Sequence, residues 1–336
     1  MQHKKLTVLL GIIGLIIGFT SLNACATKHV EATNTYHSFI EKMVTKHQFN
    51  RDELTALLND AKLQPSIIKA MSSPAEKRLE WHSYRKIFLK PDRINGGVKF
   101  WQEHRDLLQQ ASEKYGVPAE IIIAIIGVET RYGGNTGSYK VLDALMTLGF
   151  HFPKRAQFFK RELEQFLLLC REEGLNPREP KGSYAGAMGQ AQFIASSYRA
   201  YAVDGDGDNK RDLWTSHADI IHSIANYFAR HGWSNSPLIT QQTAVSGDAY
   251  KTLLSSSLKP VDSLQALKNN GVSTPPELAL DTTVKLLELQ QSDHVEHWLS
   301  FHNFYVITRY NHSHLYAMAV YQLSQEIKHG AQLAAD

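Results

Sequence analysis

The sequence predicts an α+β protein that is mainly α-helical, with a small antiparallel β domain near its end. Between about residues 37 and 233, apolar positions recur with a helical period, and proline and glycine separate helix-sized stretches. Residues 238–245 and 282–289 differ, because they read as strands between turns rich in Ser, Gly and Pro. A closing helix is expected from about Leu315.

The boundaries of these elements follow from residues that interrupt helices. The expected breaks are Pro65, Pro74, Pro91, the Gly96-Gly97 pair, Pro118, the Gly133-Gly134 pair, Gly149, Pro153 and Gly174. A strand-like run over residues 298–308 precedes the closing helix. The expected order is therefore a helical domain (36–117), a core (118–233), a small β domain (234–300) and a return strand and helix (301–336) that complete the core and the helical domain.

The amino terminus has the pattern of a secretory signal over residues 1–24. Lys4 and Lys5 precede an apolar stretch, and a small residue stands just before Cys25, as in the lipobox of bacterial lipoproteins. The alternative is an uncleaved membrane helix, but the stretch is shorter than the roughly 20 residues that span a bilayer. Because Ala26 and not an acidic residue follows, we expect a lipid anchor on Cys25 at the periplasmic face of the outer membrane, with residues 25–35 as a tether.

Composition and short motifs exclude several classes of function. The formal net charge of the 336-residue chain is +3, and basic residues are mixed with acidic ones, so no nucleic-acid partner is expected. The second of the two cysteines, Cys170, lies in an apolar helical stretch and is expected to be a buried thiol. Neither the H-E-x-x-H motif of zinc hydrolases nor the G-x-S-x-G motif of serine hydrolases occurs.

Glu129 closes an apolar run that begins at Ile121. Pro118 marks the expected start of this helix, which places Glu129 in its last turn above Ile122, Ile125 and Ile126. Burial among these side chains would favour the protonated carboxyl near pH 7, which is the form that a general acid needs. The alternative is a Glu that pairs with Arg131 or caps local backbone.

Small residues are concentrated in residues 181–193 (KGSYAGAMGQAQF). Such residues permit close approach of the backbone, so a polar ligand such as a glycan strand could contact main-chain groups there. Ser183 and Gln192 would add hydrogen bonds. The alternative is a turn with a helix packed tightly behind it.

Together these segments resemble the membrane-bound lytic murein transglycosylase B family. The resemblance rests on residues 127–133 (GVETRYG) and 182–193, and continues through 84–88, 226–228, 301–304 and 308–313. It implies a lysozyme-like catalytic core flanked by a helical domain and a small β domain. It also implies cleavage of the β-1,4 bond between N-acetylmuramic acid and N-acetylglucosamine in peptidoglycan, without a cofactor for catalysis. Cell-wall synthetic enzymes are candidate partners.

The resemblance also implies roles for single residues. The catalytic acid and base of the family falls on Glu129, with Ser183 beside it. Asn311 could instead begin the closing helix, and Tyr227 and Tyr316 could be ordinary core aromatics. The residues that the resemblance places along the glycan groove are Gln192, Tyr84, Tyr227, Tyr310, Asn311 and Tyr316.

One carboxylate suffices if the substrate supplies the nucleophile. Glu129 would protonate the glycosidic oxygen while the 2-acetamido oxygen attacks the anomeric carbon, and would then act as base toward the C6 hydroxyl. This route ends in a 1,6-anhydro ring. A lysozyme-like hydrolase, in which water attacks, and a non-catalytic glycan-binding lipoprotein are the alternatives.

An acidic loop over residues 204–219 resembles an EF-hand calcium loop. With Asp204 at position 1, carboxylates recur at every second position, and Asn209 replaces the usual turn glycine. Thr215 stands where a bidentate Glu normally closes the site, and the resembling family closes a lengthened loop with a later Asp. The expected structural calcium has as ligands Asp204, Asp206, Asp208, the Lys210 carbonyl, Asp212 and Asp219. The alternative is a solvated acidic turn.

Overall fold

The computed structural model describes residues 36–72 and 79–334 of the chain. The chain divides after Ala61 into two compact units, which are described in turn. The expected signal segment, Cys25 and the tether lie outside the described residues. Within the described ranges, no helix combines the length and the apolar character needed to cross a membrane.

The described part of the smaller unit consists of two helices, residues 36–47 and α2 (Arg51–Asn59). The Asn50 side chain caps α2, because its Oδ1 accepts hydrogen bonds from the backbone N–H groups of Asp52 and Glu53 at 2.9 and 3.1 Å. Arg51 donates to Glu41 of the preceding helix, with an Nη2–Oε2 distance of 2.7 Å. This ion pair joins the two helices at an exposed position.

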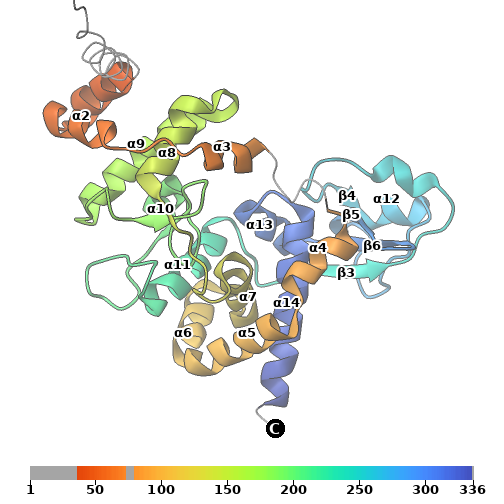
Figure 1. The fold of residues 1–336 in the computed structure, drawn as a ribbon. Coiled ribbons are helices and arrows are strands. Elements are labelled where there is room, and N and C mark those ends of the chain that lie inside the picture. Colours follow the sequence, from red (N-terminus) through yellow and green to blue (C-terminus); the bar gives the residue numbers. More distant parts are fainter. Residues whose placement is uncertain (1–35, 73–78, 335–336) are drawn as a thin grey trace, which may run out of the picture. The chain divides into compact units, whose positions relative to one another are not determined.

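The larger unit contains helices grouped around α7 and a sheet to one side of α14 (Figure 1). This arrangement confirms the predicted α+β class with a majority of helix. Its helices are α3 (Pro65–Ser72), α4 (Trp81–Phe88), α5 (Pro91–Glu103), α6 (Arg105–Tyr115), α7 (Ala119–Thr130), α8 (Val141–His151), α9 (Ala156–Glu172), α10 (Ala195–Tyr201), α11 (His217–Arg230), α12 (Leu264–Asn269), α13 (His302–Tyr310) and α14 (His314–Leu333), with 3-10 turns η2 (Pro153–Arg155) and η3 (Ala249–Leu253).

Helix α7 forms the centre of the larger unit. Residues 121–126 are fully buried, so the helix is enclosed on every face, as its all-round apolar sequence requires. It packs against α5, α6, α11 and α14.

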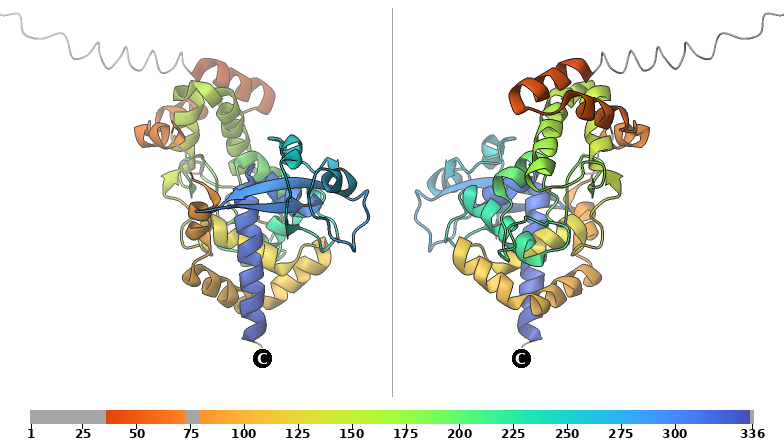
Figure 2. Two further views of the ribbon diagram at one scale, coloured as in Figure 1. Left: turned by 90° about the vertical axis from the view of Figure 1, so that its right-hand side faces the viewer. Right: turned by 90° about the vertical axis from the view of Figure 1, so that its left-hand side faces the viewer.

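The closing helix begins at His314, as predicted, and the four-stranded sheet lies near its N-terminal end, away from the marked C-terminus (Figure 2).

The sheet of the small β domain is antiparallel, with the strand order β3-β6-β5-β4. Leu264, Leu286, Leu299 and Phe301 bury their side chains in its own core. The predicted antiparallel β domain is therefore confirmed. Its strands are β3 (Thr240–Thr243), β4 (Asp262–Ser263), β5 (Thr283–Gln290) and β6 (Val295–Ser300).

A second, two-stranded sheet lies within the helical part of the unit and was not predicted. Strand β1 (Tyr139–Lys140) pairs antiparallel with β2 (Lys181–Gly182), and Tyr139 stands opposite Gly182. Strands of two residues leave no periodic pattern in a sequence. The pairing brings the segment after α7 next to the loop that begins at Lys181.

The Gly96-Gly97 pair does not end a helix, contrary to the sequence prediction, because it lies inside α5. A Cβ at Gly96 would lie 2.8 Å from the Tyr132 ring, and a Cβ at Gly97 would lie 2.5 Å from Ile327 Cδ1. The two glycines therefore allow Tyr132 and α14 to approach α5 closely. Glycine in a helix costs about 1 kcal/mol relative to alanine, and close packing offsets that cost here.

The strand-like run over residues 298–308 was predicted wrongly for most of its length. Strand β6 ends at Ser300, and residues 302–310 form α13, so a helix stands where the return strand was expected. Aromatic and β-branched residues favoured the strand. Phe304, Val306 and Ile307 are instead buried on a helix, where tertiary packing outweighs weak local propensity.

The expectation of a buried thiol is confirmed. Cys170 lies in α9 with 1% of its surface exposed, and burial raises the pKa of the thiol to about 12. A thiol in this state is unreactive at neutral pH.

His222 makes stability depend on pH. It is buried in α11, and neither ring nitrogen has a hydrogen-bond partner among the described residues. Burial, with Lys114 nearby, lowers its pKa below the usual value. Protonation of His222 is therefore less favourable in the folded protein than in the unfolded chain. Folding stability that is fully present above about pH 6.5 is lost as the pH falls below that value.

We predict that His222→Phe removes this loss, because phenylalanine fills the same space and does not titrate. The free energy of unfolding of the wild type should fall by up to about 1.4 kcal/mol per pH unit below about pH 6.5, and that of the variant by less. Denaturant unfolding between pH 7 and 5 measures this difference. The exposed His329 provides a control as His329→Gln, and equal slopes for wild type and His222→Phe would contradict the prediction.

Candidate active site

Helix α7 carries Glu129 to its C-terminal end. The helix begins after Pro118 and ends at Thr130, so Glu129 lies in the last turn, as predicted. The helix ends before Gly133, because Arg131 and Tyr132 already adopt left-handed conformations with φ of 52° and 60°. The chain turns away there, and the Glu129 side chain is half-buried rather than enclosed.

A buried arginine holds this end of the helix, and the sequence analysis missed it. Arg93 Nη1 in α5 donates to the carbonyl oxygen of Gly127 at 3.0 Å. Only 8% of Arg93 is exposed, and burial lowers its pKa. A cation near a helix C-terminus interacts favourably with the last carbonyl groups, and the Gly127 oxygen also accepts a hydrogen bond from the Arg131 backbone N–H at 3.2 Å. Arg131 pairs instead with Asp92, at an Nη2–Oδ2 distance of 2.6 Å.

Glu129 accepts a hydrogen bond from Tyr316 in the first turn of α14. The distance between Tyr316 Oη and Glu129 Oε1 is 2.5 Å. Burial raises the pKa of Tyr316 well above its usual value, and so does the nearby Glu129 carboxylate. The phenol therefore stays protonated and donates to Glu129. Tyr310 has its pKa raised by the same two causes, so it also lies near the carboxylate.

The other predicted groove tyrosines pack next to this pair. Tyr227 and Tyr310 have ring centroids 4.8 Å apart, and both hydroxyls donate to backbone carbonyl oxygens, those of Arg309 and Ala191, at 2.6 Å each. Tyr84 in α4 is 1% exposed. The structure thus brings Tyr316 and Tyr310 to Glu129, and the packed rings of Tyr310 and Tyr227 form a tyrosine wall. Tyr84, Tyr227 and Tyr316 are buried, as core aromatic residues are.

Ser183 is held inside its own loop. Its Oγ accepts hydrogen bonds from the backbone N–H groups of Ala185 and Ala187 at 3.3 and 3.1 Å. The close approach that the small residues permit is internal, since a Cβ at Gly182 would lie 2.1 Å from the Ala187 carbonyl oxygen. The placement of Ser183 beside Glu129 stays a prediction.

Gln192 ends the loop in a left-handed conformation, with φ of 49°. Its amide nitrogen donates to the carbonyl oxygens of Gly189 and Thr136 at 2.9 and 3.1 Å. These bonds orient the amide and leave Oε1 as the acceptor for a ligand. The next residue, Phe193, lies 5.8 Å from Tyr310 between ring centroids, so the loop adjoins the tyrosine wall.

Asn311 does not begin the closing helix. Ser313 is the N-cap of α14, and its side chain accepts from the N–H group of Tyr316. Asn311 follows α13 with an extended backbone, between Tyr310 and Ser313. This position stands beside the tyrosine wall, and its role in binding stays a prediction.

The acidic loop gathers three of its predicted ligands. Single carboxylate oxygens of Asp204, Asp206 and Asp219 all lie within 4.8 Å of one another. Asp219 is 1% exposed, and burial raises its pKa, as does the Asp206 carboxylate. Three oxygens at this spacing suit a calcium ion, which would relieve their repulsion.

Two other predicted ligands, Asp208 and Asp212, accept hydrogen bonds from backbone groups within the loop. Asp208 Oδ1 accepts from the N–H group of Lys210 at 2.8 Å, and Asp212 Oδ1 accepts from that of Trp214 at 2.8 Å. Asn209 adopts φ of 67°, so asparagine does replace the turn glycine as predicted.

Gln190 joins the acidic loop to α7, and the sequence analysis did not single it out. Its backbone N–H donates to Leu213 O at 2.7 Å, and its Nε2 donates to Trp214 O at 3.1 Å. Thr130 Oγ1 in turn donates to Gln190 O at 3.3 Å. A buried amide has no periodic signal in a sequence, so only the fold reveals this connection.

Known proteins resemble this chain along nearly its whole length. The membrane-bound lytic murein transglycosylase B of Escherichia coli is 43% identical over 298 residues, which cover 86% of this chain and 81% of the relative. The crystal structure of soluble lytic transglycosylase SltB1 from Pseudomonas aeruginosa is 45% identical with a TM-score of 0.83, and covers 87% of this chain and 98% of its own. The Escherichia coli lytic transglycosylase Slt35 in complex with calcium is 42% identical with a TM-score of 0.81, and covers 88% and 93%.

Residues 31–325 match the family described as the transglycosylase SLT domain. The match includes both groups of site residues described above: the end of α7 with its neighbouring tyrosines, and the loop that ends at Gln192. The chain therefore belongs to the lytic murein transglycosylases of this family.

Proposed function

We propose that this protein cleaves the β-1,4 bond between N-acetylmuramic acid and N-acetylglucosamine in peptidoglycan and leaves 1,6-anhydromuramic ends. The observation that carries the proposal is the half-buried Glu129 carboxyl group at the end of a buried helix. This group accepts a hydrogen bond from the Tyr316 hydroxyl, with an O–O distance of 2.5 Å. The family of the chain and the murein transglycosylase activity named for its Escherichia coli relative support the substrate.

In the proposed mechanism Glu129 acts first as an acid. Its proton passes to the glycosidic oxygen as the bond from that oxygen to the anomeric carbon breaks, and the 2-acetamido oxygen of the same muramic acid attacks the carbon. Tyr316 orients the carboxyl group and stabilises the carboxylate that remains, because a neutral phenol can donate to it.

Glu129 then acts as a base. It takes the proton of the C6 hydroxyl, whose oxygen attacks the anomeric carbon and displaces the acetamido oxygen, so the 1,6-anhydro ring closes and no water is consumed. Gln192, Ser183 and Asn311 would hold the sugars, while the buried Tyr227 and Tyr316 would support the carboxyl group from within the core. If water attacked the anomeric carbon instead, the enzyme would be a hydrolase and its glycan product would carry a reducing muramic acid end.

We predict that Glu129→Gln lowers the release of anhydromuramic ends from purified sacculi by about 10²- to 10⁴-fold, because glutamine keeps the shape but has no proton to transfer. Mass spectrometry of the released fragments measures the ends and separates anhydro from hydrolysed products. Glu120→Gln is a matched control, since Glu120 lies in the first turn of the same helix and pairs with Lys328 at 2.9 Å. Near-normal release by Glu129→Gln would contradict the assignment.

We predict that Tyr316→Phe lowers kcat about ten- to hundredfold with a smaller effect on KM. A hydrogen bond to a charged group contributes about 1.5–3 kcal/mol, and each 1.4 kcal/mol is tenfold in rate. Tyr305→Phe in α13 removes a hydroxyl from a half-buried tyrosine as the control. Steady-state kinetics on soluble glycan strands measures both variants, and an unchanged kcat for Tyr316→Phe would rule out the orienting role.

We also propose a structural calcium ion in the acidic loop. Asp204, Asp206 and Asp219 would be its central ligands, and Asp208, the Lys210 carbonyl and Asp212 are the further ligands that the sequence predicts. The spacing of the three carboxylates supports this site, and so does the calcium complex of the related Escherichia coli enzyme. The ion would stabilise the loop, which Gln190 connects to α7.

We predict that calcium raises the melting temperature of the wild type and not that of Asp219→Asn. A ligand at a hundredfold excess over its Kd stabilises the folded state by about 2.7 kcal/mol. Calorimetric titration measures the uptake, and Asp248→Asn, an exposed position in the β domain, is the control. No uptake at millimolar calcium would exclude the site.

For the location of the protein, we propose a lipid anchor on Cys25 at the periplasmic face of the outer membrane. The signal-like residues 1–24 support it, and the Escherichia coli relative is described as membrane-bound. Cell-wall synthetic enzymes are proposed partners on the grounds of the substrate alone.

A further inference from the structure

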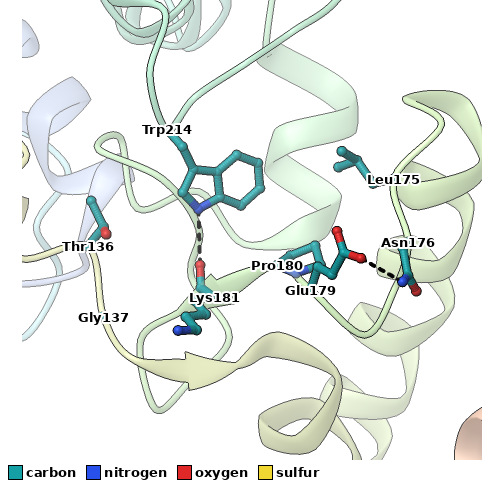
Figure 3. A pocket seen from close by; sticks show the side chains of 8 residues that line it. All are labelled: Thr136, Gly137, Leu175, Asn176, Glu179, Pro180, Lys181 and Trp214. Atoms are coloured by element: carbon teal, nitrogen blue, oxygen red, sulfur yellow. Dashed lines mark hydrogen bonds between the residues drawn. The ribbon is translucent and has the colours of Figure 1, made fainter.

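A cavity of about 410 Å³ opens beside strand β2 (Figure 3). Three segments line it: the turn after α7, the segment after α9 and the end of the acidic loop. The residues that define its chemistry are Thr136, Leu175, Glu179, Pro180, Lys181 and Trp214.

The middle of the cavity is apolar and rigid. The Trp214 Nε1–H donates to the carbonyl oxygen of Lys181 at 3.1 Å, which fixes the indole ring. Figure 3 shows one side of the ring turned toward the space bounded by Leu175 and Pro180. An indole with its N–H group already bonded offers an apolar surface to a ligand.

Opposite charges stand at two sides of this apolar middle. Glu179 and Lys181 are both exposed, and in Figure 3 their charged ends point away from each other. The Asn176 Nδ2 group donates to Glu179 Oε1 at 2.8 Å, which holds the carboxylate in place. A ligand that spans the cavity can therefore pair one anionic and one cationic group.

The cavity adjoins the loop proposed to bind the glycan. The Thr136 carbonyl oxygen on its wall accepts the hydrogen bond from Gln192 Nε2. Lys181 lies on β2, two residues before Ser183. A substituent of a sugar bound at Gln192 and Ser183 would thus have a short path into the cavity.

We infer that this cavity holds part of a peptide stem that the glycan strand carries, an inference that rests on the proposed function. Peptide stems combine small apolar side chains with both carboxylate and ammonium groups, which fit an apolar middle between Lys181 and Glu179. A sugar ring fits less well, since it presents hydroxyls around its whole edge and has no cationic group.

The test compares peptide-bearing glycan strands with the same strands stripped of peptides by an amidase. We predict that Glu179→Gln and Lys181→Gln each raise KM on peptide-bearing strands about three- to tenfold, with kcat unchanged, and that neither changes KM on stripped strands. Glu326→Gln and Lys268→Gln, both exposed elsewhere, are the controls. Thermal melting of each variant verifies that it is folded.

The outcomes separate the two proposals. A KM that rises equally on both substrates would assign the cavity to sugar and overturn the inference, as would unchanged KM on both. If the wild type formed no anhydro ends from either substrate, the proposed function itself would fail, and this inference with it.

Discussion

The larger unit depends on the burial of a helix that is apolar on every side. Helix α7 can exist in water only if other elements cover all of its faces, and α5, α6, α11 and α14 do so. This enclosure decides where chemistry can occur. Polar side chains are excluded between the two ends of the helix, so its carboxyl groups lie in the first turn, at Glu120, and in the last turn, at Glu129.

Three contacts then fix the end of that helix. Arg93 binds its last carbonyl groups, Tyr132 fits against glycines of α5, and Gln190 links Thr130 to the acidic loop. Two of these contacts involve α5, and the third involves the loop that contains Gln190. The position of Glu129 is therefore set by the packing of the surrounding helices rather than by the local backbone alone, which agrees with the precision that the proposed proton transfer requires.

The sequence predicted the local features of this arrangement. The apolar run before Glu129, its place in the last turn and the acidic pattern of the loop depend on residues close together in the chain. What depended on distant partners was missed or misread. Arg93 and Gln190 donate hydrogen bonds to carbonyl groups of other elements. The residues of α13 favour a strand by their local propensity, and only packing against neighbouring elements makes them a helix. The tyrosine wall could be proposed only through resemblance to a family, since spacing alone does not bring Tyr310 to Glu129.

The hydrogen bond between Tyr316 and Glu129 joins residues that are 187 positions apart in the chain, and Tyr316 lies on the closing helix α14. A chain is made from its amino terminus, so the carboxyl group exists long before its partner does. Only a fully synthesised chain that has docked α14 contains the complete pair. If Tyr316 orients Glu129 as proposed, fragments and unfinished chains would lack the complete pair.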